Sequence, residues 1–446
     1  MKKKKILLVT ILIVAFLIIA SVFLPLRKIS ARAVIMKTDN FSITADMMSY
    51  LMQNEIDEYI GYYKSNVGDD FMKSVGLSTK KSLRRQKSPY GNSWFEYFYD
   101  CAYQKAKEIL LINEEILKRE FAIPNYVYSS ANETVKSINT DNYNISLKNL
   151  NEIVLLQNKS AEYKKQYQEK YSENDYRKYY ISNRKKFDCV DYKRIVVELA
   201  LDEGQESSKI EMDKVMDSTK KRADELLQAI KTQGFDNAVQ EYLKNVNSQK
   251  EISDFSVIAE RYKKNVQFSE WAFDESRKVG DTVMFSGKDQ FSIYYLTKTM
   301  YPYDYIIKDV QIYETKGNYT VFSDLKSKWS KYENSKTGFS RFADDNGLKG
   351  YKSFPYLKED LPNILLNWIY SNDRKSGDFE ICDYGDSIFV MRFEGEAESY
   401  FSYCVRDAFL TYEYDKYLKS ISEQYEIKER KFFNCLLFVN WGEQYD

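Results

Sequence analysis

Apolar residues recur at helical spacing along much of the first part of the chain. Between Gly91 and Phe121 they fall on one face of a helix, at Trp94, Phe98, Cys101, Ala102, Ile109, Ile112 and Ile116. A stripe with this period is typical of an amphipathic helix that buries one side. Ser93, followed three residues later by Glu96, has the spacing of a capping box and predicts where the helix begins. We therefore expect a helical domain and assign residues 33–186 to it.

The pattern changes at Phe187 to alternating, β-rich segments followed by helix, and this order occurs twice. Each copy has the pattern of a strand, two helices and closing strands. The pattern predicts two tandem α+β modules, residues 187–303 and residues 304–396.

A short motif is common to the two copies. It has the sequence WAFDESRKVGD at Trp271–Asp281 and WIYSNDRKSGD at Trp368–Asp378. We interpret it as the turn before the closing strands, in which Gly280 and Gly377 adopt a backbone geometry that other residues resist. The tryptophan that opens each motif is interpreted as a core anchor rather than a ligand platform.

The N-terminus has the pattern of a membrane anchor. Lys2–Lys5 precede an uncharged, apolar run at Ile6–Leu26, which would span about 30 Å as a helix, the thickness of a bilayer's hydrocarbon core. Because these lysines outnumber Arg27 and Lys28 on the far side, the bulk of the chain is expected outside the cytoplasm. Residues 1–32 are thus predicted to be a cytoplasmic tip and a single-pass transmembrane signal anchor. A cleaved signal peptide is the alternative.

The C-terminal residues 397–446 return to a helical pattern. Their apolar stripe consists of Phe401, Val405, Phe409, Tyr412, Tyr417 and Ile421. Since one helix cannot bury such a stripe by itself, we expect it to pack back on the helical domain. The expected fold class is α+β, with an N-terminal transmembrane helix, a helical domain closed by a C-terminal helix, and two tandem α+β modules.

Composition excludes several classes of function. The chain of 446 residues has no His, which rules out His-based acid–base or nucleophilic catalysis and His-containing zinc sites. Its 5 Cys are scattered without metal-knuckle spacing, and it lacks the glycine-rich phosphate-binding motifs. Lys+Arg and Asp+Glu are equal at 66 each, so no global field favours nucleic acid. We predict no cofactor, no metal and no nucleic-acid partner.

Several longer stretches together resemble a known family. They are VIMKTDNFSITADMMSYLM and NSWFEYFYDCAYQKAKEILLINEEILKREF in the helical region, SENDYRKYYISNRKKFDCVDYKRIVV at the entry to the first module, and ADELLQAIKTQGFDNAVQEY with WAFDESRKVGDTVMFSGKDQFSIYYLTK within that module. These are similar to the SurA/PrsA-type foldases. The resemblance implies a chaperone whose helical domain cradles unfolded or exported polypeptides and which carries parvulin-type peptidyl-prolyl isomerase modules.

The resemblance also implies that isomerase activity is weak or absent. Parvulins usually carry one active-site His in the first strand and another near the start of the last. These positions fall on Arg194 and Ser292 in the first module and on Gln311 and Ser387 in the second. Neither module keeps either His, so we predict no catalytic residue.

Aromatic residues are the candidates for binding. The chain has 39 Tyr and 26 Phe, and a helical surface rich in them can hold exposed apolar segments of many sequences. Helix position suggests the following client-binding residues: Tyr59, Tyr62, Trp94, Phe98 and Tyr103. The alternative interpretation is that most rings lie in cores or are scattered over the surface.

Three functional hypotheses follow from the sequence. The first is a membrane-anchored extracytoplasmic chaperone or foldase that binds unfolded or exported proteins. The second is an active peptidyl-prolyl cis-trans isomerase. The third is a non-catalytic scaffold of a cell-envelope complex, and a homodimer through the modules is left open.

Overall fold

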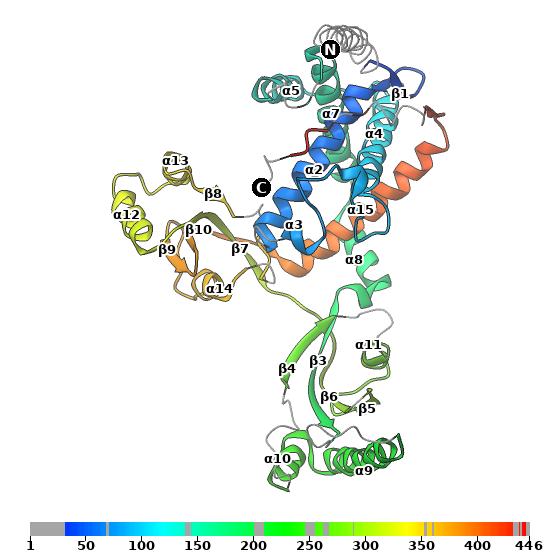
Figure 1. Ribbon diagram of the computed structural model, residues 1–446, viewed down its shortest axis with the longest axis vertical. Helices are drawn as coiled ribbons and strands as arrows, with labels where there is room; N and C mark the ends of the chain where they lie inside the picture. Colours follow the sequence, from blue (N-terminus) through cyan, green and yellow to red (C-terminus); the bar gives the residue numbers. More distant parts are fainter. Residues whose placement is uncertain are drawn as a thin grey trace, which may run out of the picture. The chain divides into compact units, whose positions relative to one another are not determined.

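A computed structural model describes most of the chain after residue 31 (Figure 1). The described residues are 32–67, 71–138, 143, 145–199, 209–245, 255–261, 267–288, 290–351, 355–358, 361–430, 437 and 439–442. The chain divides into two compact units. The first comprises Met1–Ser172, Asp309–Gly395 and Leu410–Asp446, and the second comprises Glu173–Lys308 and Glu396–Phe409.

The predicted fold class needs a correction. The described chain mixes helices with antiparallel sheets, as an α+β class requires, but the predicted transmembrane helix is not part of it. No helix within the described ranges is both long and apolar enough to cross a membrane. Residues 6–26, on which that prediction rested, lie outside the described residues.

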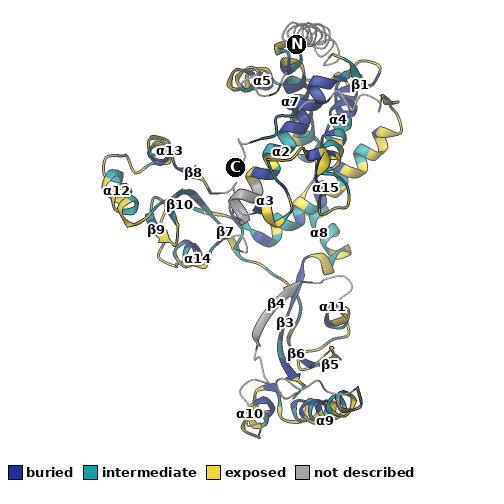
Figure 2. Cartoon of the chain, viewed as in Figure 1, coloured by how far each residue is buried: buried dark blue, intermediate teal, exposed yellow. Residues whose placement is uncertain are grey.

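The first unit contains a helical body, which we define as the described parts of residues 32–172 and 410–442. Its main helices are α2 (Ala45–Val67), α4 (Trp94–Lys118) and α7 (Leu147–Gln168). Smaller elements are α3 (Phe71–Ser74), a 3₁₀ turn at Leu83–Arg85 and α5 (Asn125–Ser137). The long helices bury the sides that face one another, as Figure 2 shows.

The start of α4 confirms the predicted capping box. The Ser93 hydroxyl accepts a hydrogen bond from the Glu96 N–H at 3.2 Å, and the Ser93 N–H donates to the Glu96 carboxylate at 2.8 Å. These two bonds satisfy backbone donors that an uncapped helix leaves open. The long helix therefore begins at a point that local sequence alone determines.

A small sheet joins the two ends of the helical body. It has the order β11-β1-β2, formed by Lys428–Glu429, Val34–Lys37 and Ser42–Thr44. Met36 lies opposite Glu429 in the antiparallel pair of β1 with β11. Residues near the C-terminal end thus complete a sheet that the N-terminal residues begin.

Tyrosine hydroxyls attach the last helix, α15 (Tyr400–Ser422), to this body. Tyr414 donates to Glu108 of α4 at 2.9 Å, and Tyr417 donates to Glu115 at 3.0 Å. Tyr425, just beyond the helix, donates to the same Glu115 carboxylate at 2.7 Å. The side chain of Glu115 is only 1% exposed, so these hydroxyls replace the water that its charge has lost.

The first α+β module belongs to the second unit. Its elements are β3 (Asp188–Glu198), α9 (Lys209–Gln233), α10 (Phe235–Asn245), β4 (Phe255–Arg261), α11 (Gln267–Ala272), β5 (Thr282–Ser286) and β6 (Gln290–Pro302). The sheet order is β4-β3-β6-β5. Helix α8 (Glu173–Ser182) and a 3₁₀ turn at Arg184–Lys186 precede it in the same unit.

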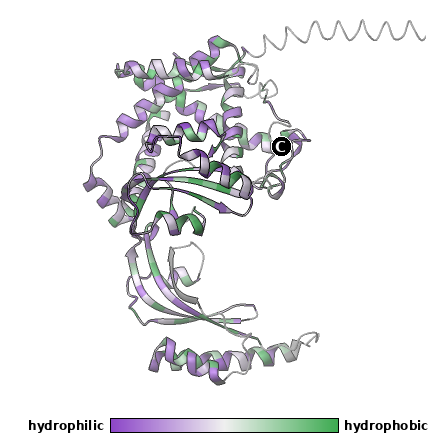
Figure 3. Ribbon diagram, turned by 90° about the vertical axis from the view of Figure 1, so that its left-hand side faces the viewer, coloured by the Kyte–Doolittle hydropathy of each residue, from purple (hydrophilic) through white to green (hydrophobic). Residues whose placement is uncertain are grey.

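The second module has the same element order. It consists of β7 (Ile306–Lys316), α12 (Tyr319–Trp329), α13 (Lys336–Asp345), β8 (Lys349–Gly350), α14 (Asn363–Ile369), β9 (Phe379–Tyr384) and β10 (Ser387–Ser399). Its sheet order is β8-β7-β10-β9, which repeats the order of the first module. Figure 3 shows that hydrophobic residues run along the strands, while the helices mix hydrophobic and hydrophilic residues.

The repeated motif forms the same turn in both modules, as its glycines predict. Gly280 and Gly377 both have φ of 93°, in the region that side chains disfavour. The N–H of Gly280 donates to the carbonyl of Leu296, and that of Gly377 to the carbonyl of Phe393, each at 2.8 Å. Each motif glycine therefore hydrogen-bonds the turn that precedes the closing strands to the last strand of its own module.

The charged residues of the motif pack on its tryptophan. The guanidinium carbon of Arg277 lies 5.5 Å from the ring centroid of Trp271, and that of Arg374 lies 4.8 Å from the ring of Trp368. Each arginine also pairs with the aspartate that ends its motif, at 3.5 and 3.6 Å. Both tryptophans are half-buried and pack against their module's core.

Opposing effects set the pKa of Glu115. Burial alone would raise the pKa of this carboxyl, but hydrogen bonds from Tyr425, Arg119 and Tyr417 outweigh burial and hold the pKa below its usual range. The charged form therefore stabilises the folded state at pH values above the unfolded-state pKa of about 4.3. This stabilisation is lost as the pH falls through the lower folded-state pKa.

Glu115→Gln tests this attachment. We expect the opening free energy of residues 410–422 at pH 7 to fall by about 2 kcal/mol, because hydrogen bonds to a charged group are stronger than those to an amide. Native-state hydrogen exchange measures it directly. Below pH 5 the variant should lose less stability than the parent chain, and Glu423→Gln, at an exposed position, should match the parent. Identical acid sensitivity of parent and Glu115→Gln would contradict this role.

Candidate functional site

Three of the predicted client-binding residues lie together in the core of the helical body. The ring of Tyr59 lies 5.3 Å from that of Trp94 and 5.4 Å from that of Phe98, centroid to centroid, with edge-on geometry. Trp94 is 0% and Phe98 1% exposed. These two rings hold α2 and α4 together, and in this conformation neither lines a surface.

The other two predicted residues lie apart from this cluster. Tyr103 is half-buried and donates a hydrogen bond to Glu429 of β11, so it helps to hold the C-terminal strand. The side chain of Tyr62 lies outside the described part of the chain. Helical periodicity found the buried face of α4 but could not separate a core from a binding groove, because both require apolar residues at the same spacing.

The degenerate parvulin positions pair in the first module. Arg194 donates to the hydroxyl of Ser292 at 3.0 Å, and its guanidinium carbon lies 5.6 Å from the ring centroid of Tyr294. An arginine remains protonated throughout the physiological range, and a serine hydroxyl does not titrate there. This pair can bind an acceptor but offers no group suited to proton transfer near neutral pH.

In the second module the corresponding residues have different contacts. Ser387 donates to the carboxylate of Glu314 at 2.5 Å. Gln311 is half-buried on β7 and lies beside a hollow at the edge of the sheet. The two modules share a fold but present different chemistry at these positions.

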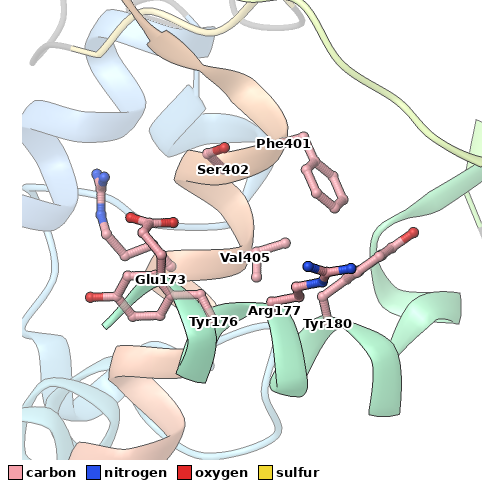
Figure 4. Close-up of a pocket in the computed structure, with 8 residues that line it drawn as sticks. Glu173, Tyr176, Arg177, Tyr180, Phe401, Ser402 and Val405 are labelled. Carbon is pink, nitrogen blue, oxygen red and sulfur yellow. The ribbon is translucent and has the colours of Figure 1, made fainter. Parts of the chain in front are cut away.

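A pocket in the second unit combines apolar walls with a charged rim (Figure 4). Tyr176 and Tyr180 of α8 form one side, and Phe401 and Val405 from the start of α15 form the other. The cavity volume is about 130 Å³. This space is large enough to admit an apolar side chain.

Charged groups surround the opening of this pocket. Arg406 donates two hydrogen bonds to Glu398, at 2.5 and 2.6 Å, and the pKa of this guanidinium is raised chiefly by that bond. Glu173 and Arg177 are exposed at the α8 side. A bound peptide would therefore meet both signs of charge around an apolar centre.

A buried carboxylate holds α8, which forms one side of the pocket, in place. Tyr180 donates to Asp188 at 2.9 Å, and Arg184 pairs with the same carboxylate at 2.9 Å. Asp188 is 0% exposed and begins β3. Burial raises the pKa of the Tyr180 hydroxyl, and its bond to the Asp188 carboxylate raises it further.

Aromatic contacts position the other side of the pocket. The ring of Phe409 lies 5.5 Å from that of Tyr176 and 5.4 Å from that of Tyr179, both nearly edge-on. Phe401 likewise meets Tyr180 at 4.8 Å. These pairs attach the first turns of α15 to α8 within the second unit.

Sequence reasoning missed this pocket. The two helices that form it are more than two hundred positions apart in the sequence, and no local motif marks their contact. The available signals were the i,i+4 spacings of Tyr176 with Tyr180 and of Phe401 with Val405. Within the described ranges, no group of three or more Cys, Asp or Glu is arranged to hold a metal ion.

Comparisons with family models and with curated proteins found no match to this chain.

Asp188→Asn tests how α8 is held. The amide keeps the shape of the side chain but loses the charge that binds Tyr180 and Arg184, so we expect α8 amides to exchange faster by an amount equivalent to about 2 kcal/mol. Hydrogen exchange of the full chain measures this. Glu225→Gln removes the same charge from an exposed position on α9. It should change the exchange free energy of the α8 amides by no more than about 0.5 kcal/mol. Equal effects of the two substitutions would contradict a positioning role for Asp188.

Proposed function

We propose that this chain is a chaperone that binds exposed apolar segments of non-native polypeptides, with modules that contribute binding rather than prolyl isomerisation. The observation that carries the proposal is the pocket between α8 and the start of α15. Its volume of about 130 Å³ admits an apolar side chain, and its walls are three aromatic rings and a valine. A site of this size recognises a feature that any unfolded chain exposes.

The charged rim supports the same proposal. Glu173, Arg177 and the Arg406–Glu398 pair offer donors and acceptors to the backbone and polar side chains that flank an apolar residue in a peptide. Because the rim carries both signs of charge, it selects no particular net charge in the ligand. Broad selection of this kind is what a chaperone for many clients requires.

The resemblance to the SurA/PrsA-type foldases stays part of the proposal. Two features are compatible with it: a helical body closed by C-terminal residues, and two modules with the same sheet order. The expectation that the bulk of the chain lies outside the cytoplasm rests on the charges around residues 2–28 and stays a prediction.

Light scattering from an aggregating client tests the proposal. The purified protein should suppress aggregation of chemically denatured citrate synthase at near-stoichiometric ratios. Ser402→Trp places an indole at the pocket mouth from an exposed position, so several-fold more of this variant should be needed. Asp407→Trp adds the same ring at an exposed position of α15 that is not part of the pocket lining and should behave like the parent.

If the protein does not suppress aggregation although circular dichroism shows that it is folded, the proposal is contradicted. A pull-down dominated by one stoichiometric partner would favour a scaffold of an envelope complex instead.

A refolding assay tests the isomerase alternative. We expect no acceleration of a refolding phase limited by prolyl isomerisation, which takes tens to hundreds of seconds without catalysis. The reason is that the degenerate parvulin positions hold the Arg194–Ser292 pair in the first module and Ser387 bound to Glu314 in the second. An acceleration that Ser292→Ala or Ser387→Ala removes would establish an isomerase.

A further inference from the structure

A groove of the helical body holds a segment of the chain itself. We define the docked segment as the described residues 437 and 439–442, which lie outside helices and strands. Leu437, Val439 and Trp441 line one hollow, whose volume is about 410 Å³, and all three pack against the core of the body. Alternate residues of an extended chain point to the same side. The docked segment therefore has the side-chain spacing of a bound extended peptide.

The chain between α3 and α4 binds the indole of Trp441. The indole N–H is shared between two carbonyl oxygens, that of Ser78 at 3.2 Å and that of Lys81 at 3.0 Å. The side chain of Gln86, a residue only 5% exposed, donates to the same two oxygens at 2.9 and 2.7 Å. Its own oxygen accepts from the Ser78 N–H at 2.6 Å. A buried amide thus holds both acceptors in place around the indole N–H.

A second buried amide binds the backbone of the docked segment. The N–H of Asn440 donates to Oε1 of Gln53 on α2 at 2.7 Å. Gln53 is 4% exposed, and its amide nitrogen donates to Asp57 at 3.1 Å, which orients the oxygen. Every non-proline residue carries a backbone N–H, so this contact does not depend on the side chain that is bound.

The groove stays formed when the docked segment leaves. The carbonyls of Ser78 and Lys81 each have two lone pairs, so each keeps its bond from Gln86 after the indole is gone. The contacts that attach residues 414–429 to the body involve other residues, since β11 pairs with β1 and Tyr417 bonds to Glu115. Release of the segment therefore opens a groove whose acceptors are already in position.

We infer that this groove binds aromatic segments of non-native polypeptides and that the docked segment competes with them for it. The inference rests on the proposed function and gives it a second, self-occupied site. An aromatic ring of the client, best an indole, replaces Trp441, and an apolar side chain replaces Leu437. A backbone N–H of the client reaches Gln53.

The contacts of the groove favour a non-native client. They require an extended backbone with apolar side chains on one side, and folded proteins bury most such side chains. Competition by the docked segment lowers the apparent affinity for clients by the fraction of molecules in which the groove is open. The site therefore favours clients that bind it better than the chain's own segment does.

A peptide that copies the docked segment tests the inference. The probe has the sequence LFVNWG of residues 437–442, with a lysine added at each end. Added to the full chain, it should speed hydrogen exchange of the Asn440 amide at least fivefold, because it displaces this N–H from Gln53. The same peptide with alanine in place of tryptophan should leave the exchange unchanged. Unchanged exchange with the tryptophan peptide at saturation would contradict the inference.

Variants of the docked segment measure the competition. Trp441→Ala should bind the peptide about tenfold more tightly than the parent in fluorescence anisotropy, because the groove is open more often. Trp441→Phe keeps a ring but loses the N–H and should show a smaller gain. Tyr319→Ala removes a ring from an exposed position on α12 and should match the parent. Adding Gln53→Leu to Trp441→Ala should weaken binding about fivefold.

Two results would overturn the inference. One is equal peptide affinity of the parent and both Trp441 variants. The other is a dimer in sedimentation that Trp441→Ala dissociates, because the groove would then hold the docked segment of a second copy.

The same proteins are tested for suppression of citrate synthase aggregation. Trp441→Ala should suppress it at a several-fold lower ratio than the parent. Equal suppression by both, with no effect of the peptide on Asn440, would remove this site but leave the proposed function. No suppression by either would remove the proposed function, and faster exchange of Asn440 would still identify the groove as a peptide site.

Discussion

The helical body depends on two adjacent carboxylates of α4 that have little access to water. Glu114 accepts hydrogen bonds from the backbone and side chain of Asn40, at 2.9 and 2.8 Å, next to the first strand. Glu115, the next residue along the helix, accepts from Tyr417 and Tyr425. A charge that leaves water costs several kcal/mol unless such bonds replace it. One helix thereby fixes both the N-terminal strands and the end of α15, and the small sheet that joins the two ends follows from that arrangement.

The modules show how a repeated scaffold diverges. Both keep the turn that glycine, arginine and tryptophan build before the closing strands, because that turn attaches the chain to its own last strand. The outer strands next to β3 and β7 differ: β4 has seven residues and β8 has two. Constraints on folding are therefore shared between the copies, while the outer strands of the two sheets differ.

Local chemistry was predictable from the sequence, and most long-range contacts were not. The capping box at Ser93 and the turns at Gly280 and Gly377 depend on residues a few positions apart, so their spacing was enough to predict them. Trp94 and Phe98 were placed on the correct helix face, but whether that face is a core or a groove depends on α2, which the spacing does not reveal. The pocket at Tyr176 and Phe401 and the short strand β8 result from pairing between distant segments, which leaves no periodic signal. The transmembrane part of the predicted fold class is not met, because no helix in the described part of the chain is long and apolar enough to cross a membrane, and residues 6–26 lie outside that part.

The pairing of β1 with β11 has a consequence for the order of synthesis. Met36 is made early and Glu429 late, and the residues between them include both modules. Each module contains all the strands of its own sheet and can fold as soon as it has emerged, whereas the helical body lacks a sheet edge and its tyrosine donors until the end of the chain appears. The newly made protein thus passes through a stage in which finished modules are joined to an open helical body, and that body itself exposes apolar surface of the kind we propose the mature protein binds.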